Sequence, residues 1–290
     1  MEYRPLLLLL ADYVKPLMRQ WAVTQEANFT TQLCGGIRYF DMRIAIRTVE
    51  NETQKRTPDK FYLVHGLYAN SAVDELLEIR SFLYKHSKEV VIVDFQHFYG
   101  MSTAEIEEFE QIIKEIFGNM LIPYQKTISS LAEVWHRRQQ VLAIGQRKNS
   151  LLGSHVWPRK IISQPWANTI DPQALAQFLD EYYRPGSREG NRFFVHQGIL
   201  STNIDHFLSN PDSTLKELAG EANKVVDKWL TYPPKVSGPG GVNIVITDFS
   251  IHNFPQFAQK VITINLMEAE EDDTFTFFYG VAWLFNFFLH

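Results

Sequence analysis

The sequence has little that would cross-link or anchor it. Its 290 residues include one cysteine, Cys34, so no disulfide can form within the chain. This is typical of a reducing compartment such as the cytoplasm, and we expect Cys34 to be a small buried residue. The apolar run at residues 6–11 is shorter than the core of a signal peptide and ends at Asp12, so we expect no secretion.

Strong charge of either sign is also missing. The formal net charge is −5 at pH 7, which argues against a nucleic-acid partner and against nonspecific attraction to anionic membranes. The apolar C-terminal stretch at residues 275–289 is too short to span a bilayer comfortably, and its flank lacks basic residues. We expect this stretch to pack into the domain. The length and the 45% hydrophobic content suit one large globular domain.

Hydrophobic periodicity predicts strands that alternate with helices. The predicted strands are residues 36–46, 61–65, 89–95, 140–145, 193–197 and 243–249. The predicted helices are residues 17–32, 71–86, 103–117, 171–183, 213–230 and 256–261, and residues 158–165 are predicted to be irregular. This alternation indicates parallel βαβ units, although periodicity alone does not separate a closed barrel from an open sheet.

Two strands carry polar groups that point to a site. Asp41 and Arg43 are two residues apart in the strand GIRYFDMRI, so their side chains share one face. They form either a buried ion pair or part of a functional site. His65 ends the strand FYLVH, where parallel α/β folds place catalytic groups, although a lone histidine is often structural. Asp248 lies near the end of VITDF and is either another site residue or a helix N-cap.

These residue types suit the cleavage of a phosphodiester. Arg43 offers a planar, permanently charged donor group for a phosphate. His65 can transfer a proton near neutral pH, and Asp41 and Asp248 can orient an imidazole or a guanidinium. Weaker polar candidates are Asp94, Gln96, His97, His196, Trp166, Asn168 and Thr169. Of these, we expect His97 to pack in a loop and His196 to lie in the core.

Several separated motifs resemble the catalytic X domain of phosphatidylinositol-specific phospholipase C, in particular the X-domain-only group of animals. They are WAVTQ, RYFDMRI, FYLVHGLY, EVVIVDFQHFYG, WANT and NIVITDF, in this order. The resemblance covers residues 17–266 and leaves a variant N-terminal segment, 1–16, and a variant acidic then apolar tail, 267–290. It implies a distorted TIM-type (β/α) barrel.

The resemblance also implies roles for single residues. His65 matches the family's general acid, Asp41 its second-strand carboxylate, and Asp248 the partner of its first histidine. Arg43 matches the arginine of metal-independent bacterial members, whereas large eukaryotic members bind calcium through a carboxylate there. We therefore expect no calcium and no other cofactor. A glycerophosphodiesterase would need a Glu-x-Asp pair on this strand, and Arg43 argues against it.

The chain departs from the family pattern in one respect. The family's general base is a histidine in a Gly-Ser-His-Asp motif on the first barrel strand, and none of the nine histidines lies in such a motif. A variant that starts late would lack this strand, and the apolar tail is one candidate to fill its place. Loss of the base should slow the reaction by about 10²–10⁴-fold.

Two functions remain open. The first is a phosphoric diester hydrolase of the phospholipase C type, impaired in this chain, which acts on a phosphoinositide lipid or inositol phosphate at a membrane surface. The alternative is a non-catalytic phosphoinositide-binding or regulatory variant that keeps the Arg43 pocket. In both cases we expect a cytoplasmic protein that is peripheral at membranes.

Overall fold

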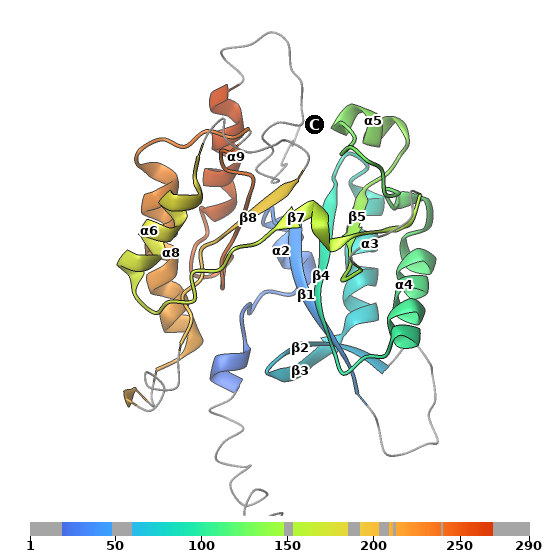
Figure 1. Ribbon diagram of the computed structural model, residues 1–290, viewed down its shortest axis with the longest axis horizontal. Coiled ribbons are helices and arrows are strands. Elements are labelled where there is room, and N and C mark those ends of the chain that lie inside the picture. Colours follow the sequence, from blue (N-terminus) through green and yellow to red (C-terminus); the bar gives the residue numbers. More distant parts are fainter. Residues whose placement is uncertain are drawn as a thin grey trace, which may run out of the picture.

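The computed structural model describes residues 19–47, 60–147, 153–184, 192–202, 209–210, 213–238 and 240–268 (Figure 1). The predicted N-terminal segment 1–16 and almost all of the predicted tail lie outside these residues. None of the helices in the described part is long and apolar enough to cross a membrane.

The six predicted strands are present, and the structure adds strands at residues 67–71 and 156–157 and a helix at residues 131–136 that the sequence did not predict. The strands are β1 Tyr39–Ile46, β2 Phe61–His65, β3 Leu67–Ser71, β4 Val91–Tyr99, β5 Val141–Ile144, β6 Val156–Trp157, β7 Ile162–Ser163, β8 Phe193–Gln197 and β9 Ile244–Ile246. The α-helices are α2 Phe29–Cys34, α3 Ala72–Lys85, α4 Thr103–Phe117, α5 Leu131–His136, α6 Pro172–Tyr182, α8 Leu215–Thr231 and α9 Phe257–Glu268. Short 3-10 helices lie at η2 Gly118–Met120 and η3 Arg159–Ile161.

The strands form two sheets. One has the order β3-β2-β1-β4-β5-β6 and the other β7-β8-β9. Strands β1, β4, β5 and β6 are parallel, as are β7, β8 and β9, which confirms the predicted α/β class. The prediction is wrong for β2, which pairs antiparallel with β1 and with β3. The region 158–165, predicted to be irregular, contributes η3 and β7.

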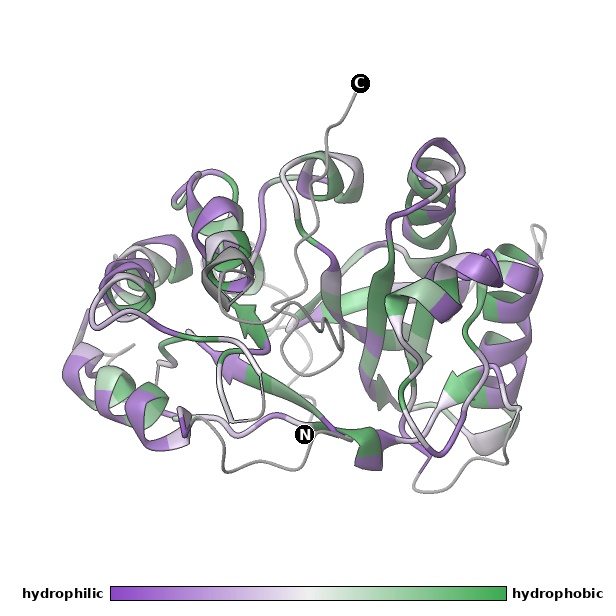
Figure 2. Cartoon of the chain, turned by 90° about the horizontal axis from the view of Figure 1, so that it is seen from above, coloured by the Kyte–Doolittle hydropathy of each residue, from purple (hydrophilic) through white to green (hydrophobic). Residues whose placement is uncertain are grey.

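Two apolar clusters show how the sheets face each other. The larger cluster packs one face of the strands against helices, and on β1 it takes Phe40, Met42 and Ile44. The second takes Tyr39 from β1 and also residues of β4, β5, β6, β7, β8 and β9. Both sheets therefore enclose one interior, as in a barrel. Figure 2 shows the strands as mainly hydrophobic and the outer faces of the surrounding helices as mainly hydrophilic.

The barrel is open on one side in the part of the chain that the structure describes. The two sheets are not hydrogen-bonded to each other, and β9 pairs only with β8. On β1, pairing with β2 begins only at Ile44, so the first half of β1 has β4 as its one partner.

Local capping explains why several helices begin where predicted. Ser102 and Glu105 form a capping box at the start of α4. Asp171 accepts a hydrogen bond from the amide of Gln173, and Pro172 takes the first position of α6. These contacts depend on residues within one turn, so the sequence alone predicts them.

The N-terminal helix predicted for residues 17–32 is wrong in its extent. Helical residues occur at 19–22 and again in α2, because the Asn28 side chain accepts a hydrogen bond from the amide of Thr31 and starts a new helix. The residues between these helices bind the end of β9 instead. Cys34, expected to be buried, is exposed at the end of α2.

A buried ion pair does exist in this region, but Arg38 forms it. The Arg38 side chain is 1% exposed and its Nε donates to Glu89 over 2.8 Å. The same guanidinium also donates to the carbonyl oxygens of Leu33 and Ile37. These bonds satisfy the charge and join the end of α2 to the start of β4.

Candidate active site

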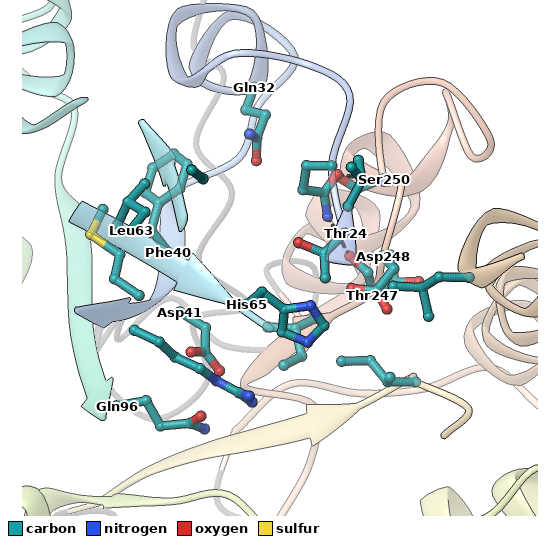
Figure 3. Close-up of a pocket in the computed structure, with 18 of the residues that line it drawn as sticks. Thr24, Gln32, Phe40, Asp41, Leu63, His65, Gln96, Thr247, Asp248 and Ser250 are labelled. Carbon is teal, nitrogen blue, oxygen red and sulfur yellow. Dashed lines mark hydrogen bonds between the residues drawn. The ribbon is translucent and has the colours of Figure 1, made fainter. Parts of the chain in front are cut away.

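The four predicted site residues line one cavity of about 1130 Å³ (Figure 3). Asp41 and Arg43 come from β1, His65 from the end of β2, and Asp248 from the turn after β9. In the view of Figure 3, His65 lies between Asp41 on one side and Asp248 on the other. This volume exceeds the ~300–1,000 Å³ of common small-molecule sites.

Asp41 and Arg43 share a face of β1, as their spacing predicts. Both side chains are half-buried, while the intervening Met42 is buried against helices. Among the described residues, neither the Arg43 guanidinium nor the carboxyls of Asp41 and Asp248 form a hydrogen bond or an ion pair. The structural ion-pair and N-cap interpretations are therefore wrong. Burying charged groups without a partner costs free energy, so their presence in this cavity favours a site that binds a ligand.

His65 reaches the cavity because of the hairpin and not because of a parallel strand end. The antiparallel pairing folds β2 back along β1 from Ile46 toward Ile44, which carries the end of β2 toward the middle of β1. Gly66 follows with a φ of +69°, a conformation that favours glycine, and β3 then pairs back with β2. The imidazole is thus held above the face that carries Arg43.

A hydrogen bond orients the imidazole. The Nδ1 atom of His65 lies 3.2 Å from the carbonyl oxygen of Ala22. Because a carbonyl only accepts, Nδ1 carries the hydrogen. The Nε2 atom is therefore the one that gains and loses a proton.

The motif WAVTQ forms a strap that ties His65 to the end of β9. The Gln25 amide donates to the carbonyl of Thr247 over 2.9 Å, and its oxygen accepts from the amide of Ser250. The amide of Phe249 donates to the carbonyl of Thr24 over 2.8 Å. These bonds hold Asp248 between two fixed backbone positions, at the edge of the cavity.

The cavity raises the pKa values of both carboxyls. Burial, helped by the nearby Asp94, raises the pKa of Asp41 to about 7, against the opposing effect of Arg43. Burial, helped by Asp41, likewise raises the pKa of Asp248 to about 7. Burial first and Arg43 second lower the pKa of His65. Near neutral pH the carboxyls of Asp41 and Asp248 are therefore partly protonated, and the imidazole of His65 is neutral.

A second polar cluster lies next to the cavity. Asp94 is fully buried and accepts hydrogen bonds from the Tyr39 hydroxyl, from Arg159 and from Gln164. Burial raises the pKa of Asp94, while Arg159 is the main group that lowers it. The sequence analysis missed Arg159 and Gln164, because they lie in the stretch predicted to be irregular. No local signal singles out Arg159.

The weaker candidates divide between the cavity and the rest of the molecule. Gln96 lines the cavity and donates to Gln164 over 2.6 Å. The register of β1 against β4 jumps from Met42↔Phe95 to Arg43↔His97, so Gln96 is the extra residue of a β-bulge. His97 is exposed on β4 and its ring lies 4.1 Å from that of Tyr99.

The structure also places three of the other weaker candidates. His196 is 1% exposed and lies in the core, as predicted. Trp166 lines the cavity, is 54% exposed and donates to the Ser201 hydroxyl. Thr169 accepts from the amide of Asp171 and so helps to start α6. In the described ranges, no three His, Cys, Asp or Glu side chains cluster as a metal site would require.

The fold is that of bacterial phosphatidylinositol-specific phospholipases C, which are TIM-barrel enzymes. The enzyme from Listeria monocytogenes matches with a TM-score of 0.63 and 19% identity over 86% of each chain. A pentafluoro-Phe variant of the Staphylococcus aureus enzyme matches with a TM-score of 0.61 and 13% identity, over 86% of this chain and 87% of that one. At these identities the likeness concerns the fold.

Sequence relatives define the family. The human PI-PLC X domain-containing protein 3 is 38% identical over 256 residues, which cover 87% of this chain and 75% of the relative. The mouse PI-PLC X domain-containing protein 2 is 34% identical over 255 residues, covering 87% and 72%. The chain belongs to the family of PI-PLC X domain-containing proteins, as its motifs predict. No family model matches the chain.

Proposed function

We propose that the cavity binds the headgroup of a phosphoinositide and is a phosphodiesterase site of the phospholipase C type. The observation that carries this proposal is the state of Arg43. Its guanidinium lines the cavity without a hydrogen bond or an ion pair to any described residue. Its charge nevertheless lowers the pKa values of His65, Asp41 and Asp248. A phosphate would supply the missing partner.

In this proposal Arg43 donates two hydrogen bonds to the non-bridging oxygens of the phosphodiester. The guanidinium then stabilises the negative charge that builds up on those oxygens as the bond to the leaving group breaks. The bound anion also offsets the repulsion between Arg43 and the imidazole, which raises the pKa of His65. The protonated Nε2 atom of His65 then protonates the leaving alkoxide.

The described part of the site lacks a second histidine that could act as the general base on the attacking hydroxyl. His65 is the one histidine among the described residues that line the cavity, and the sequence holds no Gly-Ser-His-Asp motif. Asp248 would then face the cavity without the histidine that its family counterpart orients. We propose that hydrolysis by this chain is slower than in a two-histidine site by about 10²–10⁴-fold.

The Arg43 guanidinium, which has no partner among the described residues, also favours a second function, that of a non-catalytic phosphoinositide-binding or regulatory protein. Both functions need Arg43, but only hydrolysis needs His65. A titration with an inositol phosphate, followed by a hydrolysis assay on phosphatidylinositol vesicles, separates the two. Binding without hydrolysis selects the second function, and failure to bind contradicts both.

We propose that the reaction needs no calcium or other cofactor. Arg43 shares the cavity with Asp41 and Asp248, and its positive charge opposes the approach of a cation to these carboxyls. The vesicle assay should therefore give the same rate with calcium and with a chelator. A rate that rises with calcium contradicts this part of the proposal.

We further propose that the protein works in the cytoplasm and meets its substrate at a membrane surface. Trp166 and Tyr68 line the cavity and are 54% and 50% exposed. Aromatic side chains with a polar edge suit the boundary between water and lipid. Sedimentation with phosphatidylinositol vesicles should decrease for a Trp166→Ala variant. The exposed Tyr232, which does not line the cavity, gives the control Tyr232→Ala.

A further inference from the structure

Three glutamine side chains line the cavity close to Arg43. Gln96 comes from β4, Gln164 follows β7, and Gln197 ends β8. Gln96 is the extra residue of the bulge on β4, opposite the step from Met42 to Arg43 on β1. Neighbouring strands lie about 4.8 Å apart, so a ring whose phosphate is bound to Arg43 is also within reach of Gln96.

Gln164 fixes the orientation of Gln96. The side-chain nitrogen of Gln164 donates to the buried carboxyl of Asp94 and to the Tyr39 hydroxyl, so its side-chain oxygen faces the other way. This oxygen accepts a hydrogen bond from the side-chain nitrogen of Gln96 over 2.6 Å. One N–H and the oxygen of Gln96 then have no partner among the described residues. Gln96 therefore offers the cavity one donor and one acceptor.

Gln197 offers the cavity an acceptor alone. Its side-chain nitrogen donates to the carbonyl oxygens of Gln164 and Pro165, over 3.0 Å in each case. These two bonds use both of its N–H groups. The side-chain oxygen has no hydrogen-bond partner in the part of the chain that the structure describes, although the residue is only 8% exposed. A ligand that donates a hydrogen bond would satisfy this oxygen.

The other cations around the cavity are paired or lie away from the glutamines. Among the described residues, three arginines and no lysine line the cavity. Besides Arg43 these are Arg38, which is bonded in its buried ion pair, and Arg19, which is exposed and precedes the strap. Thr24, which belongs to the strap, lies across the cavity from Gln96 (Figure 3). Arg43 is therefore the cation that a ligand at the glutamines would share.

These groups suit a hydroxyl better than a phosphate. Behind the glutamines lies the carboxyl of Asp94, whose cation Arg159 is already paired with it and does not line the cavity. A phosphate monoester carries a charge of about −1.5 to −2 at pH 7 and mainly accepts hydrogen bonds. It would face the oxygens of Gln96 and Gln197, while the phosphodiester occupies Arg43. A hydroxyl group both donates and accepts, so it matches what the glutamines offer.

We propose that Gln96 and Gln197, held in place by Gln164, form an uncharged subsite that binds ring hydroxyl groups. The subsite selects an inositol headgroup that carries its phosphodiester alone over one that carries further phosphate groups on the ring. The preferred lipid is then phosphatidylinositol itself and not its phosphorylated forms. This inference rests on the proposed function, because it takes Arg43 as the ligand of the phosphodiester.

Calorimetry of the full chain with two deacylated headgroups tests the inference. Glycerophosphoinositol should bind at least about 10-fold more tightly than glycerophosphoinositol 4,5-bisphosphate, because the added phosphates meet acceptors. A cavity without this subsite should show the opposite order, since the added charge strengthens the attraction to its arginines. Equal affinities, or tighter binding of the bisphosphate, overturn the inference and leave the proposed function standing. Absence of binding by both compounds contradicts the proposed function as well.

A charge placed at the subsite should change the selection. Gln96→Lys should strengthen binding of the bisphosphate relative to glycerophosphoinositol by about 10-fold or more, because a cation replaces an uncharged group. Gln111→Lys makes the same exchange at an exposed position of α4 outside the cavity and should leave the ratio unchanged. The same ratio in both variants overturns the inference. The measurement on the unaltered chain decides the question if Gln96→Lys does not fold.

Removal of the hydrogen-bonding groups gives a second, uncharged test. Gln96→Leu should weaken binding of glycerophosphoinositol by about 3–10-fold, because ring hydroxyls lose a donor and an acceptor. Gln111→Leu is its control and should keep the affinity of the unaltered chain. Equal affinities for these two variants would show that Gln96 does not contact the ring and would overturn the inference.

Discussion

The guanidinium of Arg43 lowers the pKa of the His65 imidazole, in addition to the larger effect of burial. Both effects favour the neutral ring near pH 7. The proposed anionic ligand would shield the charge of Arg43 and so remove the Arg43 contribution to this lowered pKa. Binding of the phosphodiester would therefore favour the protonated form of His65, which is the form that its cleavage requires.

The first prediction concerns Arg43 as the phosphate ligand. An Arg43→Gln variant should bind an inositol phosphate about 10–100-fold more weakly, because it loses charge-assisted hydrogen bonds. The pKa of His65, followed by NMR titration, should rise in the same variant. Calorimetry measures the affinity.

The exposed Arg47 provides a matched control for Arg43. It follows β1 and stacks on the Tyr62 ring at 5.7 Å, outside the cavity. Arg47→Gln should leave both the affinity and the His65 titration unchanged. Equal affinities for the two variants would show that Arg43 does not contact the phosphate.

The second prediction concerns His65 as the proton donor. His65→Ala should reduce hydrolysis of phosphatidylinositol by about 10²–10⁴-fold while inositol phosphate still binds. The loss should be much smaller for an inositol phosphodiester with an aryl leaving group, because such a group leaves without a proton. His97→Ala, at an exposed position on β4, is the control and should keep full activity. The same loss with both substrates would contradict the assigned role.

The third prediction concerns the stability cost of Asp248. Burial raises its pKa from 3.8 to about 7, so between these pH values the folded chain binds more protons than the unfolded chain. The free energy of unfolding therefore falls as the pH rises from 4 to 7. Asp248→Asn should stabilise the protein by about 1–3 kcal/mol at pH 8 relative to its effect at pH 5.

Urea unfolding at the two pH values measures the effect of Asp248→Asn. Asp74→Asn, at an exposed position in α3, should change stability by the same amount at both pH values. A pH-independent effect of Asp248→Asn would show that this carboxyl is not raised in pKa by the fold.

The fourth prediction concerns Arg159 and the buried Asp94. Arg159→Met should destabilise the chain by about 3–5 kcal/mol, because it leaves a fully buried carboxyl without its cation. The exposed Arg147, which pairs with Glu107 and Glu110, is the matched control, and Arg147→Met should cost at most about 1 kcal/mol. Adding Asp94→Asn to Arg159→Met should recover part of the loss. Equal losses for Arg159→Met and Arg147→Met would contradict this account.

Local sequence patterns predict most of the elements. The bounds Thr103–Phe117, Phe61–His65 and Phe193–Gln197 are confirmed residue for residue. Helix caps and alternating strands depend on residues only a few positions apart, so they can be read from the sequence. The helix predicted for residues 17–32 is wrong because distant backbone groups at the end of β9 bind the strap instead.

The sequence by itself determined the α/β class, the shared face of Asp41 and Arg43, and the family. Only the tertiary structure decided that β2 folds back on β1, that Arg38 rather than Arg43 forms the buried ion pair, and that Arg159 and Gln164 meet Asp94. The physical reason is the distance along the chain. Strand direction and the pairing of buried charges depend on partners tens of residues away, which no local period or spacing records.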